Sequence, residues 1–465
     1  MDELIALNQS CDNGWAEREF SGVEFGDKRI NRRMIKVMEE LSSNPLAPIN
    51  QASGDWASTK ATYRLLSNPK VNEEELFRAH REQTSRGFKG EELVLAIQDT
   101  TYLNYVGHES CAGLGYMRDA KAKGVLLHHT LCINEQGLPF GLLSQQKRTR
   151  QELKKTSHGA MKKLPIEEKE SYRWLEALRA TVSFSKGAKK VVTICDREAD
   201  IYEFFEECRN LGANYVVRVL QNRVVLHEDE TKSIRKSVLE SKVCGTINVA
   251  IVGREGEKAK QVVVSVRFAE VTMKNPKSKN FDSGFQAYAI YLDELNPVSE
   301  EERLNWLLLT NIPVTDLEGA TEKINWYKRR WSVETYHKVL KSGCKVESSR
   351  LEHIDRLNLY ITMMGIVAWR LFWMTHIARS EPDKPASAVL TELELQALSF
   401  LAGKKKKIVV PIKTTFQAIT EIAKLGGFLG RKSDGFPGPI VVWRGWEKLS
   451  NATDLLEAMD YQRCG

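Results

Sequence analysis

The stretch KKVVTICDREADIYEFFEECRN, residues 189–210, joins a short apolar run to a helical pattern through a single aspartate. VVTIC is a continuous run of mostly apolar residues, which is typical of a strand buried on both faces of a sheet. The residues that follow predict a helix over 197–210, and ANYVVRVL at 213–220 predicts the next strand. Strands that alternate with helices in this way indicate an α/β fold with parallel strands.

Three strand-like segments and one helix precede this unit. LVLAIQDTTYLNY begins at residue 93, and it is followed by VLLHHTLCIN, the turn EQG and LPFGLLSQQ, a pattern that predicts an antiparallel meander. A helix is expected over 167–184. An antiparallel meander followed by alternating helix and strand predicts a mixed α/β sheet.

The remaining sequence suggests further domains. Residues 220–303 hold several β-rich runs and loop signals, so we expect a β-rich insertion rather than a continuation of the sheet. We expect a helical segment over 1–70, the sheet-containing domain over 71–370 and a helical C-terminal domain over 371–465. The apolar window 361–378 contains Arg370 and His376, so it predicts a buried helix rather than a membrane span.

The composition narrows the class of protein. Lys and Arg number 68 against 61 Asp and Glu, a net charge of +7, so a role in nucleic-acid binding must rest on where the basic residues cluster. The eight Cys form no C-x-x-C pair, which argues against a zinc ribbon or a disulfide framework. The N-terminus shows no secretory signal, so we expect a cytoplasmic protein with reduced thiols.

One basic cluster lies in a predicted amphipathic helix, GDKRINRRMIKVMEEL at 26–41. At about 100° per residue the basic residues share one side and the apolar residues the other: Arg29, Arg32, Arg33 and Lys36 against Ile30, Met34, Val37, Met38 and Leu41. The basic side is either a solvated face or a contact surface for DNA phosphates.

Two aspartates follow predicted strands. Asp99 ends LVLAIQ, and Asp196 ends KKVVTIC. If these strands are parallel neighbours, both carboxylates lie on one edge of the sheet, where open α/β sheets hold their sites. Either aspartate alone is also explained as a turn or helix-cap residue.

A third carboxylate lies in the basic stretch YKRRWSVETYHKVLKSG, residues 327–343. On one continuous helix, Tyr327, Arg330, Glu334, Lys338 and Lys341 fall within an arc of roughly 80°. Arg330 and Lys338 are then either surface ion-pair partners of Glu334 or phosphate ligands beside a metal site. Three carboxylates without His or Cys suit Mg²⁺ or Mn²⁺, and two such ions promote phosphodiester displacement.

Several motifs together resemble one family, the DDE cut-and-paste transposases of the insertion-sequence-four group, to which the transposase of the bacterial transposon Tn-five belongs. LAIQDTT, VVTICDREADI, LNWLLLTNIPV, YKRRWSVETYHKVLKSG, IAKLGGF and GWEKL occur in the family's order and at similar spacing. The family signature Y-x2-R-x3-E-x6-K is present as Tyr327, Arg330, Glu334 and Lys341.

The resemblance implies a ribonuclease-H-like core whose metal-binding catalytic triad is Asp99, Asp196 and Glu334, with two Mg²⁺ or Mn²⁺ ions per site. It also implies a homodimer that pairs two inverted-repeat DNA ends. Such enzymes nick each end, form and reopen a hairpin, and join the 3′ ends to target DNA. The bacterial cytoplasm, at the nucleoid, is the expected location.

The resemblance further assigns DNA contacts. Trp306 matches the tryptophan on which a flipped base stacks. Arg218, Tyr327 and Arg330 match positions that hold this nucleotide and its phosphates, and Lys338 and Lys341 match basic residues near the active site. The positions that match contacts to the element's end are Arg29, Arg33, Arg64, Arg350 and Glu352. Arg356 departs from the family, which has Asn there, so the DNA end that this chain recognises is expected to differ.

Two alternatives stay open at this point. One is a stand-alone structure-specific nuclease of the same fold, and the other is a DNA-binding regulator that has lost catalysis. Retention of Asp99, Asp196 and Glu334 argues against the regulator.

Overall fold

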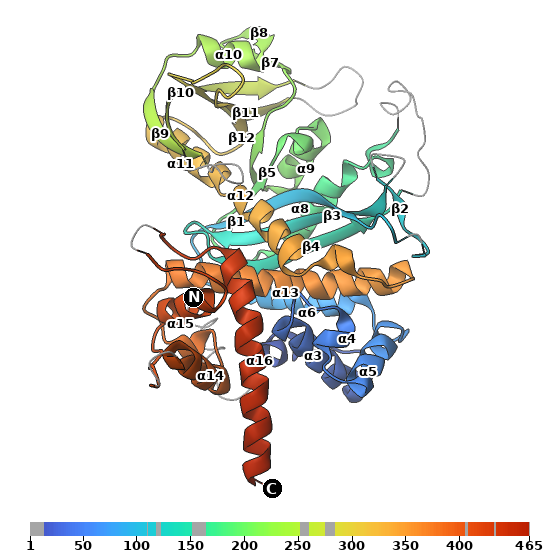
Figure 1. The fold of residues 1–465 in the computed structure, drawn as a ribbon. Helices are drawn as coiled ribbons and strands as arrows, with labels where there is room; N and C mark the ends of the chain where they lie inside the picture. Colours follow the sequence, from blue (N-terminus) through green and yellow to red (C-terminus); the bar gives the residue numbers. More distant parts are fainter. Residues whose placement is uncertain are drawn as a thin grey trace.

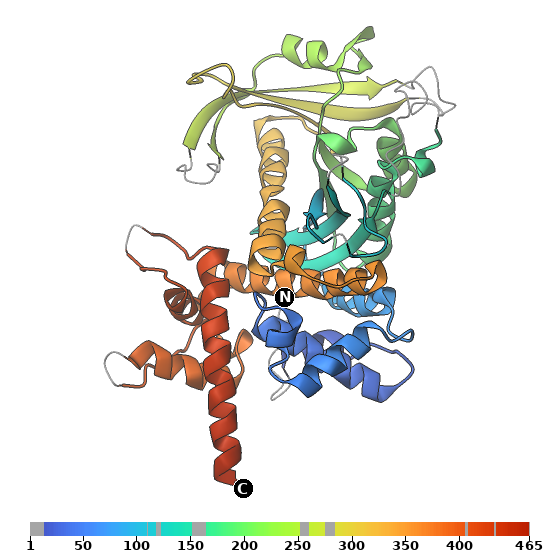
Figure 2. The same ribbon diagram turned by 45° about the vertical axis from the view of Figure 1, so that its right-hand side comes forward.

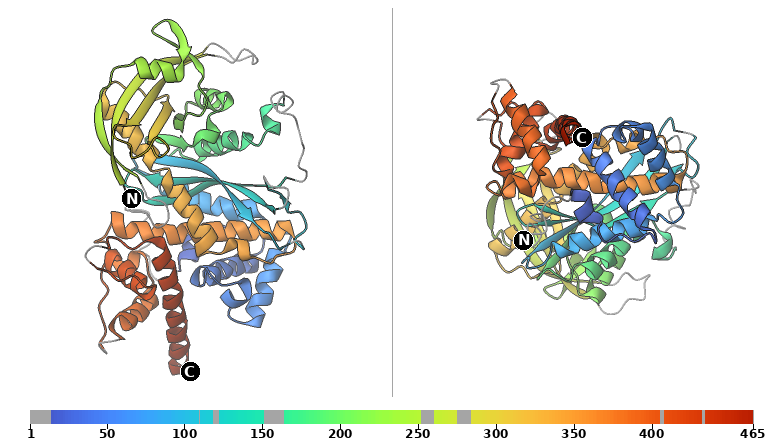
Figure 3. Two further views of the ribbon diagram at one scale, coloured as in Figure 1. Left: turned by 45° about the horizontal axis from the view of Figure 1, so that its top comes forward. Right: turned by 90° about the horizontal axis from the view of Figure 1, so that it is seen from below.

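The computed structural model describes residues 14–108, 110–117, 122–150, 164–251, 260–274, 284–404, 408–431 and 434–464. Figure 1 shows a large curved sheet on one side of the long helix α13 (Ile354–Ser380) and two groups of helices on the other. The N-terminal helices form one group and the C-terminal helices the other, and Figure 3 shows both from below.

The half of the sheet that holds Asp99 and Asp196 follows the predicted order. β1 (Val94–Asn104) pairs antiparallel with β3 (Lys123–Asn134), which pairs with β4 (Pro139–Arg148) and with the two-residue β2 (Gly115–Tyr116). β5 (Val191–Cys195) is parallel to β1, and β6 (Asn214–Arg218) is parallel to β5. Three antiparallel strands followed by two parallel strands form a ribonuclease-H-like mixed sheet, as predicted.

Helices cover both faces of these strands. α8 (Tyr172–Phe184) and α9 (Tyr202–Leu211) share one buried cluster with the alternate residues Cys195 and Val217. α13 shares another cluster with Leu95, Ile97 and Ile194, which point the opposite way. Because successive strand residues alternate between faces, Asp99 points to the side of α13 and Thr100 to the side of α8.

The expectation that residues 220–303 form a separate insertion is wrong in one respect. β12 (Asn305–Thr310) pairs antiparallel with β6 on one edge and with β11 (Phe285–Glu294) on the other, so the hydrogen-bonded sheet is continuous. Beyond β11 lie the remaining elements of the insertion: β10 (Lys260–Met273), β9 (Gly245–Ile251), β7 (Val224–His227), β8 (Glu230–Ser233) and α10 (Ile234–Glu240). The sequence WLLLT is buried throughout, which fits a strand with neighbours on both edges.

α13 is the central helix of the molecule. It is 27 residues long and apolar enough to cross a membrane by length and composition, so length alone does not exclude a span. However, 89% of its most apolar window is buried inside the fold, which confirms the prediction of a buried core helix. The predicted domain boundary at 370/371 falls within α13.

The N-terminal region is helical, with five described helices: α2 (Trp15–Phe20), α3 (Lys28–Ser43), α4 (Ile49–Ala52), α5 (Trp56–Leu66) and α6 (Glu73–Arg86). Asp27 caps α3 by accepting a hydrogen bond from the Arg29 backbone. α3 buries Met34, Val37 and Met38, as its predicted amphipathic pattern requires.

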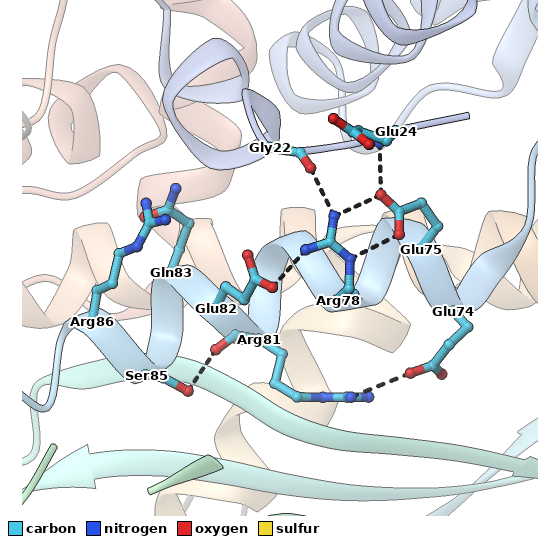
Figure 4. A network of polar contacts seen from close by, with 10 residues as sticks. All are labelled: Gly22, Glu24, Glu74, Glu75, Arg78, Arg81, Glu82, Gln83, Ser85 and Arg86. Carbon is cyan, nitrogen blue, oxygen red and sulfur yellow. Dashed lines mark hydrogen bonds and ion pairs between the residues drawn. The ribbon is translucent and has the colours of Figure 1, made fainter. Parts of the chain in front are cut away.

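Polar contacts fix the N-terminal helices on α6, as Figure 4 shows. Arg78 donates to the Glu75 carboxylate at 2.7 and 2.8 Å and to the Gly22 carbonyl at 2.7 Å, while Glu75 accepts from the Glu24 backbone at 2.6 Å. On the other side of α6, His80 accepts a hydrogen bond from the Leu142 backbone of β4 at 3.0 Å. α6 therefore connects the N-terminal helices to the sheet.

The C-terminal region packs against both α13 and α3. α14 (Glu392–Gly403) and α15 (Thr415–Leu425) each begin with a capping box, at Thr391 and Thr414. The long α16 (Pro439–Cys464) contacts the body near its start and then projects away from it (Figure 2). The Trp446 indole donates to the Ser42 carbonyl at 2.8 Å, so α16 is fastened to α3.

Candidate active site

The two aspartates lie side by side where the parallel pairing of β1 and β5 ends. Asp196 follows the last residue of β5, but the prediction that Asp99 ends its strand is wrong, because β1 continues to Asn104 through its pairing with β3. The parallel pairing of β1 and β5 ends with Gln98 opposite Cys195, and Asp99 and Asp196 are the residues that follow this pair on the two segments. The Asp99 side chain is 13% exposed. Asp196 caps the short helix η2 (Arg197–Ala199), because its carboxylate accepts from the Glu198 backbone at 2.8 Å. The cap role and the strand-end role of Asp196 are both present.

The environment of these carboxylates disfavours negative charge. Burial raises the pKa of Asp99 to about 7, although Arg330 opposes this, and the nearby charges of Asp196 and Glu334 raise it further. Burial also raises the pKa of Asp196. Carboxylates that are buried together in this way favour the approach of a cation.

Glu334 lies on a helical stretch with two irregularities. α11 (Leu317–Lys328) is followed by a turn, then by α12 (Trp331–Lys338) and by a π-helical turn, η3 (Val339–Gly343). The predicted continuous helix is therefore wrong in detail, and π turns of this kind occur frequently at functional sites. The predicted inward face is confirmed, since the side chains there are fully buried: Val333, Tyr336, Val339 and Leu340.

Arg330 lies between the carboxylates of Asp99 and Glu334. It forms an ion pair with Glu334 at 2.5 Å and lies 3.8 Å from Asp99. Burial works against its charge, but Tyr327, Glu334 and Asp99 raise the pKa of Arg330 overall. The Arg330–Glu334 ion pair that the helix spacing predicted is present.

An open pocket of about 370 Å³ lies beside Asp99. Its lining joins the end of β1 to α12 and η3 and comprises Asp99, Thr100, Thr101, Glu334, His337, Lys338, Lys341 and Ser342. Lys338 and Lys341 share this pocket with Glu334, as their spacing predicted. Asp196 does not line it.

His337 was missed by the sequence analysis, although its position three residues after Glu334 places it on the same side of the helix.

The residues predicted to hold a flipped nucleotide form a second cluster. Trp306 on β12 packs edge-on against Tyr327 with ring centroids 5.1 Å apart, and the Arg218 guanidinium lies 5.9 Å from the Trp306 ring. Trp306 is 9% exposed and Tyr327 is 3% exposed. Arg330 lies 6.0 Å from the Tyr327 ring and connects this cluster to the carboxylates.

Three family models match this chain in sequence order. A transposase DNA-binding model matches residues 12–71, a transposase DDE domain model matches 169–370, and a transposase Tn5 dimerisation domain model matches 366–464. The chain belongs to the Tn5-type DDE transposases. Its domains are those of an enzyme that binds DNA, cuts or transfers DNA strands with a divalent metal, and oligomerises through its C-terminal region.

The three carboxylates predicted to bind metal have the chemistry that the metal requires. Asp99, Asp196 and Glu334 offer carboxylate oxygens, which Mg²⁺ and Mn²⁺ prefer. Among the residues that the structure describes, no three His, Cys, Asp or Glu side chains lie close enough to hold one ion as they stand. Glu334 instead faces Arg330, which lies nearer to it than to Asp99. The three carboxylates are chemically suited to a metal site. In this structure Arg330 supplies the positive charge beside Glu334 and Asp99.

A buried arginine that the sequence analysis missed links the segments around Asp99 and Asp196. Arg173 on α8 donates to the Thr100 hydroxyl at 3.0 Å and forms an ion pair with Glu198. Thr100 follows Asp99, and the Glu198 backbone binds Asp196. Arg173 thus connects the neighbours of both aspartates. Its sequence context gave no signal, because the contact depends on how α8 packs across the sheet.

The predicted contacts to the end of the DNA element do not line the pocket. Arg29, Arg64, Arg350 and Glu352 are exposed, and Arg33 is half-buried. Arg29 pairs with Asp27 at 3.0 Å. On α5, Trp56 is 78% exposed and Tyr63 is 42% exposed, beside Arg64. The spacing of these aromatic residues along the helix was a signal that the sequence analysis did not use.

Proposed function

We propose that this transposase excises a DNA element through its inverted-repeat ends, by nicking, hairpin formation and hairpin opening, and joins the 3′ ends to target DNA. The observation that carries the proposal is the placement of Asp99 beside Asp196 where the pairing of β1 and β5 ends, with Glu334 and two lysines lining one pocket with Asp99. Phosphodiester chemistry needs carboxylates for metal and cations for phosphate in one place.

Asp99, Asp196 and Glu334 would hold two Mg²⁺ or Mn²⁺ ions. Bound there, the ions would activate water or a 3′-hydroxyl and stabilise the leaving oxygen. Lys338 and Lys341 line the same pocket and would bind the phosphates on either side of the cut. Arg330 would then contact phosphate rather than Glu334, because a bound cation takes over the neutralisation of that carboxylate.

In the hairpin step, Trp306 would stack on a base flipped from the duplex, with Arg218, Tyr327 and Arg330 holding the flipped nucleotide. Trp306 is 9% exposed and packs on Tyr327, so stacking requires the neighbouring side chains to move aside. This movement is the conformational step that DNA would have to induce.

The end DNA would contact the N-terminal helices and the segment before α13. Arg29, Arg33 and Arg64 offer basic groups on α3 and α5, and Arg350 and Glu352 contact the segment that follows β1, at Gly107 and Ala112. We assign end binding to residues 1–70, catalysis to 71–370 with its insertion at about 220–303, and dimerisation to 371–465. The functional unit is a homodimer that pairs two ends in the bacterial cytoplasm, at the nucleoid.

The test combines the purified protein, Mg²⁺ and DNA that carries the inverted repeats flanking its gene. Nicks, hairpins and joined products are expected in that order, and Asp99→Ala should bind the ends but yield none of them. Cleavage without end pairing or joining would instead support a stand-alone nuclease. Cleavage by the Asp99→Ala protein would refute the assignment of the triad.

A further inference from the structure

A chain of buried histidines leads to Asp99 from inside the fold. His129 on β3 is the cross-strand partner of Asp99, so the two side chains share one face of the sheet. The His129 Nδ1 atom lies 3.1 Å from Nε2 of His337, and the His337 Nδ1 atom lies 3.9 Å from the Asp99 carboxylate. His129 is fully buried and His337 is 6% exposed. His337 therefore stands between the core and the carboxylate, at the wall of the pocket.

The inner end of this chain is also fixed. The Gln145 side-chain nitrogen lies 2.9 Å from Nε2 of His129. The Tyr336 hydroxyl donates to the Gly365 carbonyl on α13 at 3.2 Å and lies 3.4 Å from the same His129 nitrogen. β4, α12 and α13 thus all hold His129 in place.

With the Gln145 amide nitrogen facing His129, these contacts assign one tautomer to each histidine. An amide nitrogen can only donate, so His129 accepts at Nε2 and, as a neutral imidazole, carries its proton on Nδ1. His337 must then accept at Nε2 and carry its own proton on Nδ1, the nitrogen that faces Asp99. The Asp99 carboxylate, 3.9 Å from that nitrogen, favours an N–H there, so both ends of the chain lead to the same arrangement.

We propose that His337, oriented through His129 and Gln145, is a positioning residue that directs an N–H toward Asp99 and holds its carboxylate ready for the divalent metal. The proposal rests on the proposed role of Asp99 as a metal ligand. Partners of this kind orient metal ligands in many sites, and their loss typically weakens metal binding about 10- to 100-fold.

Two substitutions of one residue separate positioning from packing. In His337→Asn the amide reaches the place of Nδ1 and can still donate to Asp99, whereas in His337→Gln it reaches the place of Nε2 and contacts His129 instead. Both replace the imidazole by an amide in the same buried site. If His337 only fills space, the two variants should have the same effect, because both lose the ring. If His337 positions Asp99, the effect should depend on which ring nitrogen the amide replaces.

The experiment is a Mn²⁺ titration of the full chain without DNA, followed by the electron paramagnetic resonance signal of free Mn²⁺. Relative to the unsubstituted protein, His337→Asn should bind within about three-fold, and His337→Gln should bind about 10- to 100-fold more weakly. Equal affinities of the two variants would overturn the proposal. Thermal midpoints of both proteins establish that they are folded.

Two further variants complete the design. Asp99→Ala should lose this Mn²⁺ binding. Unchanged binding by Asp99→Ala would reject the proposed metal role of Asp99. This control therefore distinguishes a wrong assignment of Asp99 from a wrong inference about His337. If His337→Gln does not fold, Gln145→Met takes its place, because it removes the donor that orients His129 without touching the pocket. A weakened Mn²⁺ affinity of Gln145→Met supports the proposal, and an unchanged affinity overturns it.

Discussion

Replacement of Asp99 by Asn should stabilise the metal-free protein. Asp99 is buried beside Asp196 and within the field of Glu334, so its carboxylate is held where a charge is disfavoured. Asn has nearly the same shape and no charge, so the substitution removes the repulsion and keeps the packing. Function and stability therefore oppose each other at this residue.

The magnitude follows from the pKa. Asp99 titrates at about 7 in the folded protein against 3.8 as the ordinary value. Between these pH values the folded chain binds more protons than the unfolded chain, so stability falls as the pH rises from about 4 to about 7. A difference of about 3 pKa units corresponds to at most about 4 kcal/mol at pH 8. For a chain of this length that is roughly 4 °C in the thermal midpoint at most.

The assay is thermal unfolding in EDTA at pH 8 and pH 5, with the natural chain and Asp99→Asn side by side. The variant should melt higher at pH 8, and the gap should shrink at pH 5, where Asp99 already carries its proton. Asp27→Asn is a control of opposite sign, since hydrogen bonds from Arg29 lower the pKa of Asp27 to about 2. A gap that is equal at both pH values, or a less stable variant at pH 8, would refute the reasoning.

Three other predictions concern DNA. Glu334→Gln should retain end binding in a gel shift and lose nicking by at least about 100-fold, because an amide cannot replace a metal-binding carboxylate; retained nicking would remove Glu334 from the triad. Lys338→Ala and Lys341→Ala should each weaken DNA binding and lower the slope of log Kd against log salt concentration by about 1. Arg64→Ala on α5 serves as a comparison. Unchanged slopes would show that neither lysine contacts phosphate. Trp306→Phe should support hairpin formation better than Trp306→Ala while both nick at similar rates, and the alanine variant should cost about 3 kcal/mol or more in stability; parallel loss of nicking and hairpin formation would make Trp306 purely structural.

The sequence predicted the parts of the site that depend on local pattern. The parallel pairing of the two apolar runs put Asp99 beside Asp196, although β1 continues past Asp99, and helical spacing put Glu334 near Arg330 and Lys338. These relations follow from the rise and pairing of strands and the period of a helix.

The rest depended on tertiary packing. The continuity of the sheet through β12 was missed, because a buried apolar strand does not reveal which neighbours it has. Arg173 and His129 were missed for a similar reason, since their roles come from residues 73 and 208 positions away in the chain, at Thr100 and His337. Those contacts exist only once α8 and α12 have packed on opposite faces of the sheet.

The central position of α13 has a consequence for how the protein can be divided. The sheet, the N-terminal helices and the C-terminal helices all pack against this one helix, so α13 is part of the core of each of the three regions. A fragment that ends at residue 370 would lose the last third of α13 and expose apolar residues of the remaining helix that the C-terminal helices cover in the whole protein. Proteolysis or truncation near this point should therefore give insoluble products rather than independent domains, and a fragment meant to fold alone must carry the whole helix to Ser380.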